Sequence, residues 1–275
     1  MDRRSVLRTG LAGATVTLLG ALSRPQTAAA ALGPPAGSST AGVPRPPLGN
    51  VPYGSIIYSP TVPGTAAIIF EQGPYIYTPQ LLDTLKDKKA KATFAICGNN
   101  LDKGAIDDPG RPWPDVIKRV SDAGHQLANN TWDHFDLSTL PESDRRNQLY
   151  QVEMALRNII GKFPTYMWPP YDSANADVLA TLDALGYHGL SANLDTDAYD
   201  SANDIQKSMD IVSTAVNASD PERDSFFIRM DEILETTVTK LVPFAIDTLK
   251  TKGYRLTTVG EALADPAENW YRSAS

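Results

Sequence analysis

Cysteine is nearly absent from the 275-residue sequence, which contains only Cys97. A single cysteine cannot form an intrachain disulfide, and it cannot build the thiolate cluster of a structural zinc site. Cys97 ends the apolar stretch 92–97, so it is predicted to pack as a small buried hydrophobe. The fold must therefore be stabilised by its core, for which a hydrophobic content of 42% is ample.

Basic residues are fewer than acidic ones, with 25 Lys and Arg against 32 Asp and Glu and a formal net charge of −7. Loss of residues 1–30 would remove four arginines and one aspartate, which changes the net charge to −10. An acidic protein repels a phosphate backbone, so no nucleic acid is expected as a partner.

Apolar runs long enough to cross a bilayer comfortably are missing as well. The N-terminal sequence Asp2-Arg3-Arg4-Ser5-Val6-Leu7-Arg8 resembles the twin-arginine export motif, and a mildly apolar region follows at 9–22. Small residues at 27–30 resemble a cleavage site, and an ordinary secretory signal is the alternative. We therefore predict that residues 1–30 are a bacterial, twin-arginine-like export signal of an extracellular protein that has no stable membrane insertion.

The rest of the chain divides into an arm and a domain. Residues 31–60 are rich in proline and glycine, which predicts a linker or an arm that wraps the domain. Residues 61–272 alternate predicted strands and helices, which is typical of an α/β protein with a parallel sheet. Seven strands over this length indicate an irregular (β/α)7-8 barrel. The predicted strands are 66–71, 92–97, 125–131, 165–169, 187–194, 224–230 and 254–259, and the predicted helices are 79–88, 113–123, 143–160, 176–185, 204–216, 237–252 and 260–264.

The first predicted strand of this domain ends in a polar pair. The apolar run 66–70 stops at Glu71 and Gln72, and a Gly-Pro break follows at 73–74. Thr78 is predicted to cap the next helix, with proline at its first position. Because the C-terminal ends of barrel strands carry the chemistry, Glu71 and Gln72 are expected in the active site.

The stretch 70–74, Phe-Glu-Gln-Gly-Pro, resembles the first motif of the polysaccharide deacetylases (NodB-type, carbohydrate esterase family 4), which reads Thr-Phe-Asp-Asp-Gly-Pro. Further phrases, at 73–78, 91–94, 98–100, 153–158 and 163–167, resemble those of fungal-type chitin deacetylases. The resemblance covers about residues 60–272 and implies the barrel of that family. It also implies that Glu71 stands at the position of the catalytic base and Gln72 at that of a metal ligand.

The second motif of the family, His-Thr-x-x-x-His or a shorter relative, supplies two imidazole ligands. The matching stretch here is Asn130-Thr131-Trp132-Asp133-His134, so His134 matches the second ligand and Asn130 replaces the first. With Gln72, two of three ligands are neutral amides, which bind a dication poorly. We therefore predict no metal and no other cofactor.

The later motifs are altered too. Trp168 replaces the arginine of Arg-Pro-Pro-Tyr, which orients the catalytic carboxylate in the family, and Tyr171 matches its tyrosine. An indole cannot replace a guanidinium, although it can stack on a sugar ring or simply fill space. Asp195 and Asp197 match an acidic stretch that couples to the catalytic apparatus in the family, or they are ordinary loop residues. The resemblance further implies that Asp231 stands at the position of the general-acid histidine, or Met230 if the alignment shifts by one residue, so the histidine is absent either way.

These substitutions indicate a degenerate metal and catalytic site, and three functions stay open. The favoured hypothesis is a repurposed, metal-independent enzyme that performs acid/base chemistry, such as cyclisation, isomerisation or elimination, on a small molecule or glycan. The alternatives are a glycan-binding pseudoenzyme and a residual polysaccharide N-deacetylase with a rebuilt metal site. The predicted catalytic residues are Glu71, Asp231 and His134, and the predicted substrate-binding residues are Gln72, Asn130, Trp168, Tyr171, Tyr75, Trp132, Asp195 and Asp197.

Overall fold

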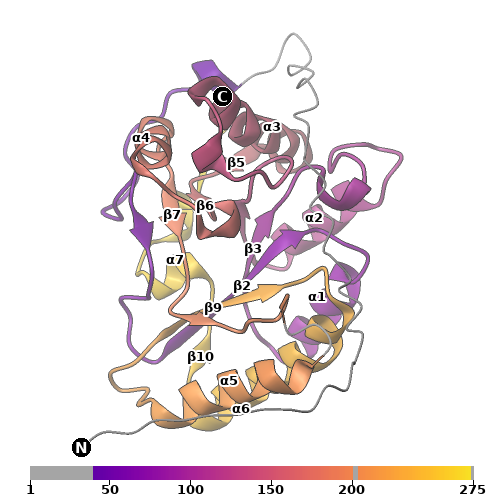
Figure 1. Cartoon of the computed structure of the whole chain (residues 1–275), viewed down its shortest axis with the longest axis vertical. Coiled ribbons are helices and arrows are strands. Elements are labelled where there is room, and N and C mark those ends of the chain that lie inside the picture. Colours follow the sequence, from indigo (N-terminus) through magenta and orange to yellow (C-terminus); the bar gives the residue numbers. More distant parts are fainter. Residues whose placement is uncertain (1–39, 201–203, 274–275) are drawn as a thin grey trace, which may run out of the picture. The chain divides into compact units, whose positions relative to one another are not determined.

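The core of the fold is a parallel sheet around strand β2 (Thr65–Gly73), whose nine residues are all buried. The computed structural model describes residues 40–200 and 204–273. The strand order is β1-β7-β6-β4-β3-β2-β9-β8, with β10 added beside β2 (Figure 1). The other strands of this sheet are β1 (Ile56–Ile57), β3 (Thr93–Ile96), β4 (Gln126–Asn129), β6 (Tyr166–Met167), β7 (His188–Leu190), β8 (Leu194–Asp195), β9 (Phe226–Asp231) and β10 (Arg255–Leu256).

Every neighbouring pair in this sheet is parallel. Within the described ranges, β1 and β8 are the two ends of the strand order, so the barrel is open between them. A separate antiparallel pair joins β5 (Lys162–Pro164) to β11 (Tyr271–Ser273). The α/β class and the irregular barrel predicted from the alternation of elements are confirmed. The short strands β1, β5 and β11 were not predicted, and the single strand predicted at 187–194 is two separate strands, β7 and β8.

The helices lie within two residues of their predicted bounds, except that the helix predicted at 237–252 begins five residues later than predicted, after a π-turn. They are α1 (Thr78–Asp87), α2 (Trp113–Asp122), α3 (Glu142–Ile160), α4 (Ala176–Leu185), α5 (Ile205–Ala218), α6 (Val242–Lys252), which follows a π-turn at Thr237–Leu241, and the short α7 (Val259–Ala262). Figure 1 shows α5 and α6 side by side along one edge of the sheet. The predicted cap of α1 was wrong in detail, because Tyr77 is the N-cap and the Thr78 hydroxyl accepts a hydrogen bond from the Tyr75 N–H at 2.8 Å.

Side chains along β2 alternate between two layers of the core. Ala66, Ile68 and Phe70 pack in the outer cluster with residues of the helices, while Ala67 and Ile69 pack in the inner cluster with residues of the barrel interior. Because successive side chains of a strand point to opposite faces, Glu71 continues the inner row. The alternation of side chains along β2 therefore directs the Glu71 carboxylate into the barrel, at the C-terminal end of the strand.

The described part of the predicted arm, residues 40–60, packs on the domain. Arg45 forms an ion pair with Glu153 of α3, in which the Nη2–Oε2 distance is 2.7 Å and both side chains are buried. The Arg45 guanidinium also lies over the rings of Tyr150 and Phe163, at 5.5 and 5.2 Å from their centroids. The bounds of the three predicted segments stay a prediction, and the export signal predicted at 1–30 lies outside the described residues.

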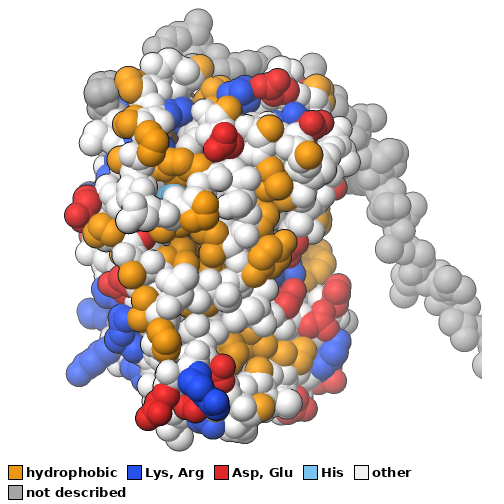
Figure 2. All heavy atoms as spheres, turned by 90° about the vertical axis from the view of Figure 1, so that its left-hand side faces the viewer, with side chains coloured by type: hydrophobic (Ala, Val, Ile, Leu, Met, Phe, Trp, Pro, Cys, Tyr) orange, Lys and Arg blue, Asp and Glu red, His pale blue; other side chains and the backbone are white. Residues whose placement is uncertain are grey.

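The surface seen from the β1 and β7 side carries apolar side chains in its centre, and acidic and basic side chains mix toward its two ends (Figure 2). No broad area of one charge sign covers this face, and the exclusion of nucleic acid stays a prediction. In the part of the chain that the structure describes, no helix combines the length and the apolar character needed to cross a bilayer.

Candidate active site

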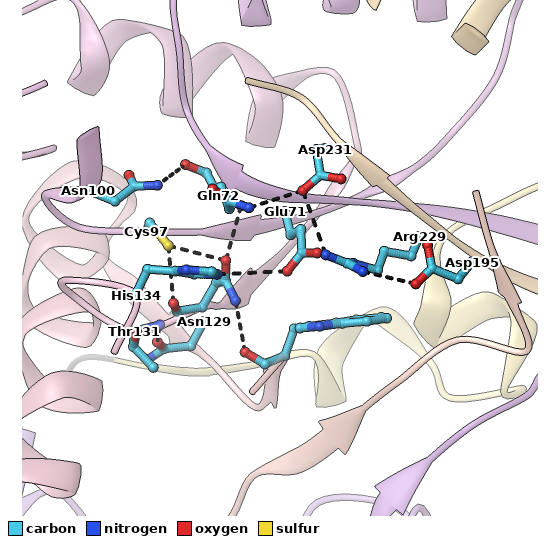
Figure 3. Close-up of polar contacts among 12 residues, drawn as sticks. Glu71, Gln72, Cys97, Asn100, Asn129, Thr131, His134, Asp195, Arg229 and Asp231 are labelled. Atoms are coloured by element: carbon cyan, nitrogen blue, oxygen red, sulfur yellow. Dashed lines mark hydrogen bonds and ion pairs between the residues drawn. The ribbon is translucent and has the colours of Figure 1, made fainter. Parts of the chain in front are cut away.

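Glu71 and Asp231 lie side by side inside the C-terminal end of the barrel (Figure 3). The parallel register pairs Glu71 of β2 with Asp231 of β9, and both are nearly inaccessible, at 1% and 2% exposure. Gln72 follows Glu71 on β2, and its Nε2 donates a hydrogen bond to Asp231 Oδ1 at 3.0 Å. The structure thus brings together three residues that sequence reasoning placed in one site.

Arg229 supplies the cation of this site, and sequence reasoning missed it. Its Nε donates a hydrogen bond to Glu71 Oε1, and its Nη1 donates one to Asp195 Oδ2 at 2.9 Å. Its Nη2 lies 3.8 Å from Asp231 Oδ1. The expectation that Glu71 had lost its arginine partner was therefore wrong, because the guanidinium comes from β9 and not from the end of β6. The alternation of β9 was the available signal, since Phe227, Arg229 and Asp231 share one face of that strand.

Burial and charge change the proton affinity of this cluster. Desolvation and the nearby Glu71 carboxylate raise the pKa of Asp231 to about 7, against a smaller opposing effect of Arg229. Burial alone would lower the pKa of Arg229, but the surrounding carboxylates raise it above the usual value for arginine. Asp231 is therefore a carboxyl group that holds its proton near neutral pH, next to a guanidinium that stays charged.

His134 faces this cluster from the loop after β4. Its Nε2 lies 3.9 Å from Glu71 Oε2 and has no hydrogen-bond partner among the described residues. The imidazole centroid is 5.0 Å from the ring of Tyr171, and the backbones of both residues are left-handed, with φ of 58° and 61°. This conformation costs a non-glycine residue roughly 1–2 kcal/mol, so the surrounding loops must stabilise it. The predicted group of Glu71, Asp231 and His134 is therefore brought together.

The two carboxamides at the expected ligand positions are engaged within the protein. Asn130 Oδ1 accepts a hydrogen bond from the Gln72 N–H at 3.0 Å, and Asn130 Nδ2 donates to the Trp168 carbonyl at 2.9 Å. The buried thiol of Cys97 lies 3.1 Å from Asn130 Oδ1, so the predicted burial of Cys97 is confirmed. Asn130 therefore acts as a brace between the ends of β2 and β6.

The family that the sequence resembles implies a divalent metal here, and the donor set does not fit one. Of the three residues at ligand positions, Gln72 and Asn130 are neutral and hydrogen-bonded, and His134 alone retains a suitable nitrogen. Within residues 40–200 and 204–273, no three histidine, cysteine or acidic side chains are grouped so that they could hold an ion.

The other predicted binding residues differ in their exposure. Tyr171 is 63% exposed beside His134, whereas Trp168 is only 1% exposed and offers no free ring surface for stacking on a sugar. Trp132 packs so closely over Gly98 that a Cβ there would lie 2.0 Å from its ring. A role for these side chains in binding stays a prediction, as it does for the partly exposed Tyr75 and for Asp197, which forms an ion pair with Lys207.

Known proteins resemble this chain over most of its length. Residues 58–190 match the family described as polysaccharide deacetylase. A chitin deacetylase of Pestalotiopsis sp. is 40% identical over 86% of this chain and 76% of the relative. The solved structure of the chitin deacetylase from Colletotrichum lindemuthianum is 39% identical, covers 82% of this chain and 98% of that one, and gives a TM-score of 0.78. A peptidoglycan-N-acetylglucosamine deacetylase of Listeria monocytogenes is 31% identical over 71% of this chain and 38% of that protein.

These similarities overturn the favoured function. The favoured hypothesis, a repurposed, metal-independent enzyme of cyclisation, isomerisation or lyase type, was wrong in its reaction class, because the relatives at about 40% identity are chitin deacetylases over nearly the whole fold. The hypothesis gave great weight to the lost metal ligands and the apparently lost arginine, while Arg229 in fact holds the carboxylate at the base position. The recognition of the family from its motifs is confirmed, and the chain belongs to the polysaccharide deacetylase family.

Proposed function

We propose that this protein hydrolyses the N-acetyl groups of glycans that contain N-acetylglucosamine, such as chitin. The observation that carries the proposal is the buried Glu71 carboxylate, which Arg229 holds beside the protonatable Asp231. A base and an acid side by side at the end of a barrel are the pair that amide hydrolysis needs. The names of the chitin deacetylase relatives support the choice of substrate class.

In the proposed reaction, Glu71 accepts a proton from a water molecule as the water oxygen bonds to the acetyl carbon. The bond between that carbon and the amide nitrogen then breaks, and Asp231 donates its proton to the departing nitrogen. The products are acetate and a glucosamine residue with a free amine. The unpartnered Nε2 of His134, in the tautomer that carries a proton there, is available to donate a hydrogen bond to the carbonyl oxygen.

Glycan binding without turnover is the second candidate. The observation that favours it is the engagement of both carboxamides in internal hydrogen bonds. Neither carboxamide is then free to hold a metal ion, and a metal ion is what would polarise the acetyl carbonyl. The exposed ring of Tyr171 at the mouth of the site would then contribute stacking on a sugar.

One experiment separates the two functions. Chitin hexamer is incubated with the purified protein, with and without added Zn²⁺, while acetate release is measured enzymatically and binding is measured by calorimetry. Hydrolysis predicts acetate release above the buffer rate together with measurable binding. Binding without acetate supports the second candidate and contradicts the first, and the absence of both contradicts the two proposals. The fully deacetylated hexamer is the matched control, because it has the same chain length and no acetyl group.

The pH dependence should follow the proton on Asp231. Since the pKa of Asp231 is raised to about 7, the donating form is populated below that pH and is lost above it. We expect kcat/KM to fall about tenfold per pH unit on the alkaline side of this value. In Asp231→Asn, turnover should fall about 10²-fold and this alkaline limb should disappear. The exposed Asp210→Asn is the control, and an unchanged alkaline limb in Asp231→Asn would exclude Asp231 as the proton donor.

A further inference from the structure

The guanidinium of Arg229 lies among carboxylates from three strands, in contact with Glu71 of β2 and Asp195 of β8 and within ion-pair distance of Asp231 of β9. The Arg229 side chain is 22% exposed and Glu71 is buried, so the contact with Glu71 is made with little solvent around it, whereas Asp195 holds the guanidinium from its half-exposed side. Charge-assisted hydrogen bonds of this kind are about twice as strong as neutral ones, and the planar guanidinium fork makes them directional.

The strand register places Arg229 where it can reach both carboxylates. Arg229 pairs with Ile69 on one side and with Asp195 on the other, so its Cα lies one inner-face position below the Glu71–Asp231 pair. The side chain must therefore run upward along the barrel wall to reach Glu71. A long side chain with donors at both Nε and Nη can make this reach and still contact Asp195.

At the end of β6, the neighbouring wall of the barrel carries an indole instead of a guanidinium. Trp168 stands at the position where the resembling motif has an arginine, and it is buried with an indole Nε1 that has no partner among the described residues. Its backbone is fixed on both sides, since its N–H donates to the Asn129 carbonyl at 2.8 Å and its carbonyl accepts from Asn130. Trp168 therefore closes the wall, and the orientation of Glu71 depends on β9.

We propose that Arg229 is a positioning residue that fixes the orientation of the Glu71 carboxylate, and that Asp195 anchors the guanidinium from its other side. Arg229 acts through Glu71 and needs no contact with the glycan. The proposal rests on the proposed hydrolysis for its kinetic test, and on the ion pair alone for its spectroscopic test.

The kinetic test compares Arg229→Met, Arg229→Lys and Asp195→Asn. Because a base that is misplaced by about 1 Å can lose about 10²-fold in rate, kcat should fall about 10²-fold in Arg229→Met and about tenfold in each of the other two variants. KM should change less than about threefold, and the effects of Arg229→Met and Asp195→Asn should not add up, because the two residues act as one unit. Arg223→Met, an exposed arginine paired with Asp220, is the matched control. A higher KM and a lower melting temperature with an unchanged kcat would show a purely structural role and overturn the proposal.

The spectroscopic test does not depend on turnover. In ¹H–¹⁵N spectra, the Arg229 Nε–H signal, assigned by its loss in Arg229→Lys, should be protected from exchange and should shift when Glu71 is replaced by Gln. The Arg223 signal should not respond to that replacement. If the parent protein releases no acetate but the Arg229 signal behaves in this way, the hydrolysis proposal fails and the positioning role stands. A signal that is insensitive to Glu71→Gln overturns the positioning role whatever the activity.

Discussion

Replacing Glu71 by Gln is expected to lower acetate release from chitin oligomers by about 10³-fold and to change the glycan dissociation constant less than about threefold. Glutamine has nearly the same shape as glutamate, and its carbonyl oxygen can still accept the hydrogen bond from Arg229. It cannot accept a proton from water at neutral pH. The variant therefore separates loss of the base from loss of the local structure.

The measurement is the rate of acetate release under saturating hexamer, together with calorimetric binding of the same hexamer. Glu222→Gln is the matched control, because it makes the same chemical change at an exposed position. If Glu71→Gln released acetate at the parent rate, another group would have to activate the water, and the proposed hydrolysis through Glu71 would be wrong.

Restoring the two ligand types is expected to raise the affinity for Zn²⁺ strongly. In the double variant Gln72→Asp and Asn130→His, a carboxylate and an imidazole would join His134 to form a three-ligand set. Replacing a residue that only hydrogen-bonds to a metal ligand typically alters the metal affinity 10–100-fold. Adding two residues that bind the ion directly should therefore raise the affinity for Zn²⁺ by at least about 10³-fold. Competition with a chromophoric chelator measures this difference directly.

The single variants should each show a smaller gain, and the exposed Asn158→His should show none, because it adds an imidazole away from the site. The new histidine also removes the brace that Asn130 forms between Gln72 and Trp168, so some loss of thermal stability is expected. If the parent protein already bound Zn²⁺ as tightly as the double variant, the dication would have to be held by other residues.

The elements that the sequence predicted well are those with a strong local signal. The apolar run before Glu71 and most of the predicted helices depend on neighbouring residues, and the structure reproduces these elements within a few residues. The strands β1, β5 and β11 have only two or three residues, which is too short for a period to be recognised. They exist because distant segments pair with them.

The site residues also differ in whether a local sequence signal marks them or their role depends on distant segments. Glu71, Asp231 and His134 could be predicted because each lies at a strand end or in a recognisable motif. For Arg229, the alternation of β9 indicates only the face on which it lies, because its role depends on the register that places β9 between β2 and β8. The engagement of Asn130 was also hidden, since hydrogen bonds between β2 and the end of β6 leave no sequence signature. The missed arginine contributed to the wrong function, because Glu71 was taken to lack a guanidinium partner.

The salt bridge between Arg45 and Glu153 has a consequence for where the folded unit begins. Glu153 is completely buried in the middle of α3, and the cation that neutralises it comes from a segment that looks like a linker by composition. A chain that begins at residue 61 would leave the Glu153 carboxylate in the protein interior without Arg45, which should lower the free energy of unfolding by about 3–5 kcal/mol. Residues 40–60 thus contribute a buried ion pair to the folded unit, and their removal is expected to destabilise it.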